Sequence, residues 1–272
     1  MSFRKRLVIQ FTGYEGLHPK AVRVRHALAL KDFDRLWHAK TKLPPMKDEP
    51  DDCGTFTATT HGNGWQTETE FCQFGTADIF DDYAARSTPK RMLTGFRAFM
   101  NILFTGTLLR YLTTSWRFVM FFLWPFLLSI VIIAIAALIA YAPIFAGFPV
   151  WNLVWSLPIA AVVATLLVRW PGDRFFMSYL LDDWSAAYDR IYGRNDKLNA
   201  RRKAFAEALK KKIEESNADE VVIVGHSLGT VPAVEALADL QRQRPDLLKK
   251  QPVSMLAIGS CLLMIALHPK AK

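Results

Sequence analysis

Cysteine is scarce in this 272-residue sequence: only Cys53, Cys72 and Cys261 occur, and they lie far apart. None of their spacings is that of a paired metal ligand, so we expect no metal site. An odd number of isolated thiols is typical of a reducing compartment and argues against a disulfide-stabilised secreted scaffold. The first apolar run, residues 7–11, is too short for the core of a signal peptide, so nothing indicates export.

Charge is absent from a long central segment. Between Arg117 and Arg169 there are 51 consecutive residues without Asp, Glu, Lys, Arg or His. Near its middle, two prolines and a glycine interrupt this segment. A helix is expected to stop there, because proline lacks the helical N–H donor. The apolar runs on either side, residues 118–141 and 150–168, would be ~36 and ~28 Å long as helices, which matches the ~30 Å hydrocarbon core of a bilayer. We therefore predict a transmembrane hairpin at 118–170 rather than two buried core helices.

The predicted hairpin has an uncharged loop but is flanked by basic residues. These are Arg97, Arg110, Arg117, Arg169 and Arg174. By the positive-inside rule, both soluble arms lie in the cytoplasm. The excess of 34 Lys and Arg over 25 Asp and Glu fits such flanks facing anionic lipid, and no known nucleic-acid-binding motif accompanies it. We expect the lipid bilayer, and not nucleic acid, as a partner. The largely apolar segment 92–117 is predicted to be an amphipathic interfacial segment, since a third span there would separate the arms.

The two arms, residues 1–91 and 171–272, are predicted to form one α/β domain. Strands are expected at 6–12, 65–74, 221–225 and 253–258, and helices at 19–37, 175–191, 196–213 and 228–242. The polar stretch from 38 to 64 is rich in proline and glycine and is expected to be loop. Strands that alternate with helices in this way favour a parallel sheet with helices on both faces.

A glycine-rich turn joins the third predicted strand to the helix after it, with the sequence Gly225-His226-Ser227-Leu228-Gly229. This G-x-S-x-G pattern, between a buried strand and a helix, is typical of a nucleophile elbow. The tight turn would project the Ser227 hydroxyl, while Gly225 and Gly229 would allow neighbouring backbone to approach closely. The Leu228 N–H would face the oxyanion of a tetrahedral intermediate. His226 is adjacent to the serine in sequence and would point elsewhere, so we interpret it as a residue that packs near the serine or supports the site indirectly, and not as the catalytic base.

The GHSLG elbow resembles the α/β-hydrolase family, in particular its lipase- and esterase-like members. The resemblance covers residues 6–74 and 196–269. It implies that residues 7–12 lead into an oxyanion loop at 12–16, with the Tyr14 N–H as the second oxyanion donor. A membrane hairpin between the early strands and the elbow is similar to bacterial membrane-associated hydrolase-like proteins. This similarity implies a multi-pass protein of the bacterial inner membrane with both termini in the cytoplasm.

Acidic residues and histidine are nearly missing after the elbow. The last acid is Asp246 and the one later histidine is His268, whereas the family places an acid and then a histidine after the nucleophile. Three interpretations stay open. The chain is C-terminally incomplete, or it is complete and inactive, or His268 is the base with an acid such as Asp78, Asp81 or Asp82. The first is favoured, because a buried parallel strand near the end leaves a sheet edge open.

The sequence as a whole predicts a membrane-anchored serine hydrolase that acts through Ser227 on an ester, a thioester or a lipid. Such an enzyme uses the serine itself as nucleophile, and no cofactor is expected. The alternative is a catalytically inactive hydrolase-fold scaffold that binds a partner or a lipid. The substrate and the oligomeric state are left open by the sequence.

Overall fold

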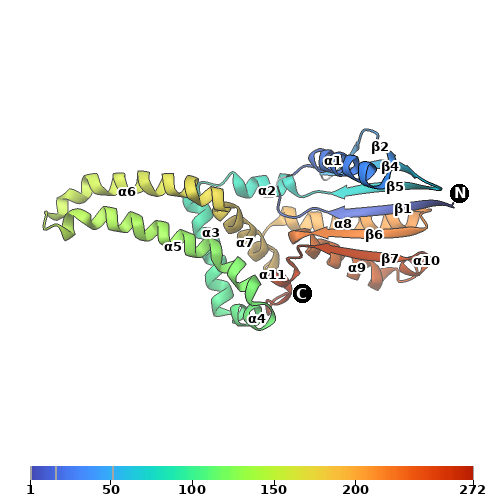
Figure 1. Ribbon diagram of the computed structural model, residues 1–272. Helices are drawn as coiled ribbons and strands as arrows, with labels where there is room; N and C mark the ends of the chain where they lie inside the picture. Colours follow the sequence, from blue (N-terminus) through green and yellow to red (C-terminus); the bar gives the residue numbers. More distant parts are fainter. Residues whose placement is uncertain (1, 16, 51, 272) are drawn as a thin grey trace. The chain divides into compact units, whose positions relative to one another are not determined.

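The computed structural model of the chain describes residues 2–15, 17–50 and 52–271. The chain divides into two compact units. The first unit consists of Met1–Asp82 and Gly193–Ala266 and holds the β-sheet. Figure 1 shows the strands of this sheet side by side, with helices packed beside them. The second unit consists of Tyr83–Tyr192 and Leu267–Lys272 and holds the apolar helices. The sheet unit is thus built from two stretches of sequence that the helical unit separates.

Seven strands form one sheet in the described part of the first unit. They are β1 (Ser2–Phe11), β2 (Lys40–Lys42), β3 (Lys47–Glu49), β4 (Cys53–Gly62), β5 (Trp65–Phe74), β6 (Glu220–His226) and β7 (Val253–Ile258). Their order is β2-β4-β5-β1-β6-β7, with β3 also paired to β4. β1 is parallel to β5 and β6, and β7 is parallel to β6. The predicted α/β class is confirmed, but the sheet is mixed rather than parallel, because β4 runs antiparallel to β5, β2 and β3.

Strand β4 occupies most of the stretch that was predicted to be loop, so that prediction was wrong. Phe56 and Ala58 are buried at alternate positions, and threonines stand between and around them, which is the period of a strand. β4 turns back into β5 through Asn63 and Gly64, where Gly64 has a φ of +78°. An Asn-Gly pair in this backbone region makes a tight hairpin turn. The surrounding prolines and glycines hid this hairpin in the sequence.

Helices cover both faces of the sheet, as predicted. The helices that lie wholly or partly in the sheet unit are α1 (Pro19–Trp37), α2 (Ala77–Ala84), α8 (Asp196–Glu215), α9 (Thr230–Gln243), α10 (Leu247–Lys250) and α11 (Leu262–Ala266). On one face, the buried ring of Phe205 from α8 lies 5.6 Å from that of Phe11 and 5.2 Å from that of Phe74. On the opposite face, the ring of His26 from α1 lies 5.2 Å from that of Phe71. Side chains of opposite parity on β5 therefore meet different helices.

The second unit contains two helices that are long and apolar enough to cross a membrane, α5 (Trp116–Phe145) and the helical stretch Val150–Phe175, whose regular part is α6 (Leu153–Leu167). They contact each other, and the Ser156 hydroxyl of α6 donates to the Ala140 carbonyl at 2.7 Å. Many large apolar side chains on both helices are exposed, which is consistent with membrane association.

The first of these helices is longer than predicted. Its predicted end at residue 141 was wrong, since α5 continues through Pro143 and ends before Gly147, which has a φ of +83°. A proline in the last turn removes only one hydrogen bond, whereas a glycine with positive φ is the usual end of a helix.

The segment predicted to be interfacial forms two helices, α3 (Thr88–Phe104) and α4 (Thr107–Thr114), which are bent by 77° at the break between them. Taken together they are also long and apolar enough for one broken span, so the described residues provide two or three candidate spans. α7 (Met177–Ile191) packs on α3, where Arg91 binds the buried Asp182 at 2.6 Å. We had predicted residues 171–272 to belong to the sheet domain, but α7 belongs to the helical unit.

Candidate functional site

A tight turn of the sheet unit lies between β6 and α9. β6 ends at His226, a single 3-10 turn spans Ser227–Gly229, and α9 begins at Thr230. Ser227 has a φ of +51°, which is uncommon for any residue with a side chain. Such a backbone costs on the order of 1–3 kcal/mol and persists only where the surrounding structure imposes it. The strained serine is therefore held in place by the packing on both sides of the turn.

Two glycines of the turn are required by that packing. A Cβ on Gly225 would stand 2.8 Å from Thr230 Cα, and a Cβ on Gly229 would stand 2.4 Å from the carbonyl oxygens of Phe11 and Thr12. These neighbours are backbone atoms that cannot rotate away. The role expected of Gly225 and Gly229, to let backbone approach the turn closely, agrees with these distances.

The loop between β1 and α1 lies directly against the serine. A Cβ on Gly13 would stand 2.8 Å from Ser227 Cβ and 3.4 Å from Ser227 Oγ. Tyr14 follows Gly13, and its buried ring lies 4.2 Å from the Phe80 ring. Gly16, the last residue of the predicted oxyanion loop, lies outside the described residues. The loop that was predicted to carry the second oxyanion donor is thus in contact with the elbow.

Leu228 occupies the other predicted donor position. It is buried and is the second residue of the helical turn that leads into α9. The first N–H groups of a helix have no intrahelical carbonyl as partner and carry the positive end of the helix dipole. An oxyanion formed on a substrate at Ser227 would meet this end of the helix.

Cys261 is the side-chain neighbour of the serine. Its Sγ lies 3.5 Å from Ser227 Oγ, and its N–H donates to the Ser227 carbonyl at 3.1 Å. The Thr230 hydroxyl donates to the same carbonyl at 2.7 Å. Among the described residues, no imidazole nitrogen lies within hydrogen-bond distance of Ser227 Oγ. This thiol contact could not be expected from the sequence, because it depends on how β7 pairs with β6.

His268, the residue considered as a possible catalytic base, lies in the helical unit. Its side chain is buried there, its Nε2 lies 3.0 Å from Asn101 Oδ1, and its Nδ1 accepts from the Lys270 N–H at 3.1 Å. Burial, with smaller contributions from Arg110 and Lys270, lowers the pKa of His268. Both ring nitrogens are therefore engaged within the helical unit.

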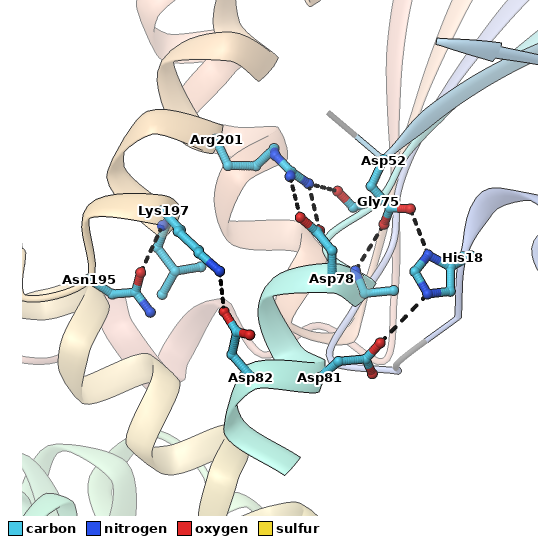
Figure 2. A network of polar contacts seen from close by, with 11 residues as sticks. His18, Asp52, Gly75, Asp78, Asp81, Asp82, Asn195, Lys197 and Arg201 are labelled. Atoms are coloured by element: carbon cyan, nitrogen blue, oxygen red, sulfur yellow. Dashed lines mark hydrogen bonds and ion pairs between the residues drawn. The ribbon is translucent and has the colours of Figure 1, made fainter. Parts of the chain in front are cut away.

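The three acids that were considered as its partner lie on α2 and have cationic partners of their own (Figure 2). Asp78 accepts two hydrogen bonds from the buried Arg201, at 2.8 and 3.1 Å. Asp82 pairs with Lys197, and Asp81 lies 3.6 Å from His18 Nε2. These contacts join α2 to α8 and to the start of α1.

His18 lies between two carboxylates in the same network. Its Nδ1 is 2.9 Å from Asp52 Oδ1, while the other carboxylate oxygen of Asp52 accepts from the Ala77 N–H at 3.0 Å (Figure 2). The hydrogen bond to Asp52 raises the pKa of His18, with further contributions from Asp81 and Asp78. Because His18 directly precedes α1, this network holds the far end of the β1–α1 loop.

The raised pKa of His18 predicts a pH dependence of stability. The charged imidazole is favoured in the folded chain, so its contribution is full below the ordinary pKa of 6.5 and is lost as the pH rises through the raised value. We expect the free energy of unfolding in detergent to fall by less than about 1 kcal/mol over this window, since His18 is largely exposed. His18→Gln should abolish the change, whereas His61→Gln, at an exposed histidine, should retain it. An identical pH dependence in His18→Gln would contradict the assignment.

A second ion-pair group was missed from the sequence. Glu15 pairs through Oε1 with His226 Nδ1 and accepts through Oε2 from Arg25 at 2.9 Å. All three line a hollow of about 270 Å³, together with Gln10, Thr12, Val22, His26, Ala29 and Ile258. No local feature of the sequence pointed to this contact, because it depends on how β1 pairs with β6.

Comparisons with known proteins add no relative to this geometry: no family model, no curated protein and no solved structure matches the chain. Among the described residues, no group of three or more His, Cys, Asp or Glu side chains could hold a metal ion. The chemistry of the site therefore rests on its own residues. These are a serine at a tight turn, one N–H group at the start of the helix and one in the loop, and a neighbouring thiol.

Proposed function

We propose that the chain is a membrane-anchored serine hydrolase of the α/β-hydrolase type, with Ser227 as nucleophile. The observation that carries this proposal is the φ of +51° at Ser227, at a turn from a parallel strand into a helix. A left-handed backbone at this point is the geometry of a nucleophile elbow, which turns the hydroxyl out of the sheet. The absence of room beside Gly225 and Gly229 supports the same reading.

The proposed reaction is acyl transfer to the serine. Ser227 Oγ attacks the acyl carbon, the carbonyl oxygen becomes an oxyanion, and the Leu228 and Tyr14 N–H groups stabilise it. The bond to the alcohol or thiol then breaks as this leaving group takes up the proton that Ser227 Oγ has lost, and water releases the acyl group as a carboxylic acid and restores the Ser227 hydroxyl. Ester, thioester or lipid substrates fit best, because two helices of the same chain are suited to a membrane.

A fluorophosphonate probe tests this proposal, because it phosphonylates serines that are activated for attack. We expect the full chain in detergent to be labelled at Ser227 and the Ser227→Ala variant to be unlabelled. Ser254→Ala, at an exposed serine of β7, is the matched control and should be labelled like the parent chain. Lack of labelling in the parent chain, or equal labelling of Ser227→Ala, would overturn the proposal.

A second candidate function is a hydrolase-fold scaffold that binds a lipid or protein without turnover. It is favoured by one observation: among the described residues, the side chain within hydrogen-bond distance of Ser227 Oγ is the thiol of Cys261 and not an imidazole. Without a base, serine nucleophiles lose several orders of magnitude in rate. A properly folded chain that stays unlabelled by the probe but binds vesicles would support the scaffold.

We further propose that the chain is a multi-pass protein of the bacterial inner membrane, with both arms of the sheet unit in the cytoplasm. The uncharged α5–α6 loop between arginine-flanked helices supports this orientation. In intact cells, an impermeant maleimide should label Phe148→Cys in the loop and should label Leu36→Cys on α1 only after lysis. The native cysteines are buried and give little background. Labelling of Leu36→Cys in intact cells would contradict the orientation.

A further inference from the structure

Glu15 joins three elements of the sheet unit through one carboxylate. Oε1 pairs with Nδ1 of His226, the last residue of β6, and Oε2 accepts from Arg25 on α1. Glu15 itself belongs to the loop between β1 and α1. Its side chain is 18% exposed, whereas that of His226 is 39% exposed. The carboxylate is therefore more sheltered than its histidine partner.

The backbone of the same loop also packs closely on the elbow, at Gly13. A Cβ on Gly13 would stand 2.8 Å from both the His226 carbonyl oxygen and Ser227 Cβ, so a larger residue has no room there. Tyr14 stands between Gly13 and Glu15, so the peptide that carries the Tyr14 N–H is held on both sides. One side is held by close packing on the elbow and the other by the ion pair to His226.

We propose that Glu15 and His226 are positioning residues, which hold the Tyr14 N–H at the distance from Ser227 that oxyanion stabilisation requires. This inference rests on the proposed function; it specifies the supporting role of His226 by its partner, Glu15, and by the group that the pair positions. One oxyanion donor contributes roughly 10²- to 10³-fold to rate, and a misplacement of about 1 Å costs up to about 10²-fold. A partly exposed ion pair adds little to folding stability. The pair should therefore affect reactivity much more than stability.

The test is the kinetics of Ser227 phosphonylation by a fluorophosphonate, measured on the full chain in detergent. Glu15→Gln is expected to lower the saturating rate constant roughly 10- to 100-fold, while the half-saturating probe concentration and the thermal midpoint stay unchanged. His226→Gln should give the same loss. The double variant should lose no more than either single variant, because both act through one contact.

The matched control is Arg35→Met on α1, which removes an exposed ion pair with Asp32 that does not touch the elbow. Its labelling kinetics should equal those of the parent chain. The rate constant refers to each folded molecule, so partial unfolding of a variant does not imitate the expected loss. If Glu15→Gln raised only the half-saturating probe concentration and left the saturating rate constant unchanged, the residue would act in binding, and the positioning role would be overturned.

The outcomes separate the two proposals. If the parent chain is labelled at Ser227 and Glu15→Gln is labelled equally fast, the positioning role fails and the hydrolase proposal stands. If the losses of Glu15→Gln and His226→Gln multiply in the double variant, the two residues act independently and the proposal is again wrong. If the parent chain is not labelled, the hydrolase proposal fails and takes the positioning role with it.

Discussion

Gly229→Ala is expected to destabilise the sheet unit by about 1–3 kcal/mol, although alanine is the better helix former. Gly229 has a helical φ of −62°, so an alanine there would gain up to ~1 kcal/mol from helix propensity. Its Cβ, however, would stand 2.4 Å from the carbonyl oxygens of Phe11, the last residue of β1, and of Thr12, which follows it, and this backbone cannot move alone. The steric cost therefore outweighs the gain. Unfolding of the full chain in detergent measures the net effect.

The same substitution should also slow phosphonylation of Ser227, because relief of the clash moves the end of β1 and the loop after it. Gly64→Ala is the control. Gly64 has a φ of +78° but open space around it, so alanine there should cost about 1–2 kcal/mol from backbone strain and leave the labelling rate unchanged. A Gly229→Ala variant as stable and as reactive as the parent chain would contradict the close packing at the elbow.

Phe205→Ala is expected to cost about 3–5 kcal/mol of unfolding free energy. The Phe205 ring is 2% exposed and packs on two further buried rings, edge to face on Phe11 and stacked on Phe74. Its removal leaves a cavity between α8 and two strands whose positions are fixed by hydrogen bonds. Chemical denaturation in detergent, followed by tryptophan fluorescence, measures the loss.

Phe33→Ala provides the comparison for the same change at the surface. Phe33 on α1 is 36% exposed, and its ring stacks on that of Trp37. We expect it to cost about 1–2 kcal/mol, since a third of the side chain already faces water and its removal leaves no enclosed cavity. Equal losses for the two variants would show that α8 does not seal the core as described.

Elements whose own residues carry a strong pattern could be predicted. β5 and β7 occur at the predicted bounds, because one alternates and the other is mostly apolar, but β7 is an exposed edge strand and the prediction that it is buried was wrong. The tight turn from β6 into α9 was predictable because its two glycines and its serine lie within five consecutive residues. The span of α5 was predicted in kind but not in length, because one proline near a helix end does not stop it.

Features that depend on pairing between distant segments could not be predicted. The threonine-rich pattern of β4 indicates a strand only once its hairpin with β5 is known. The mixed sheet follows from that hairpin. The contact of Glu15 with His226 exists only because β1 is placed directly beside β6. The sequence contains no local sign of that neighbour relation, since the two residues are more than 200 positions apart.

The position of β1 between β5 and β6 also sets an order of events during synthesis. About 145 residues separate the end of β5 from the start of β6, which takes about 7–30 s at 5–20 residues per second. Throughout that interval one edge of β1, with the apolar Leu7 and Ile9, has no strand to pair with. Both long apolar helices leave the ribosome before β6 does. The nascent sheet therefore exposes an unpaired strand edge until the segment after the hairpin has been made.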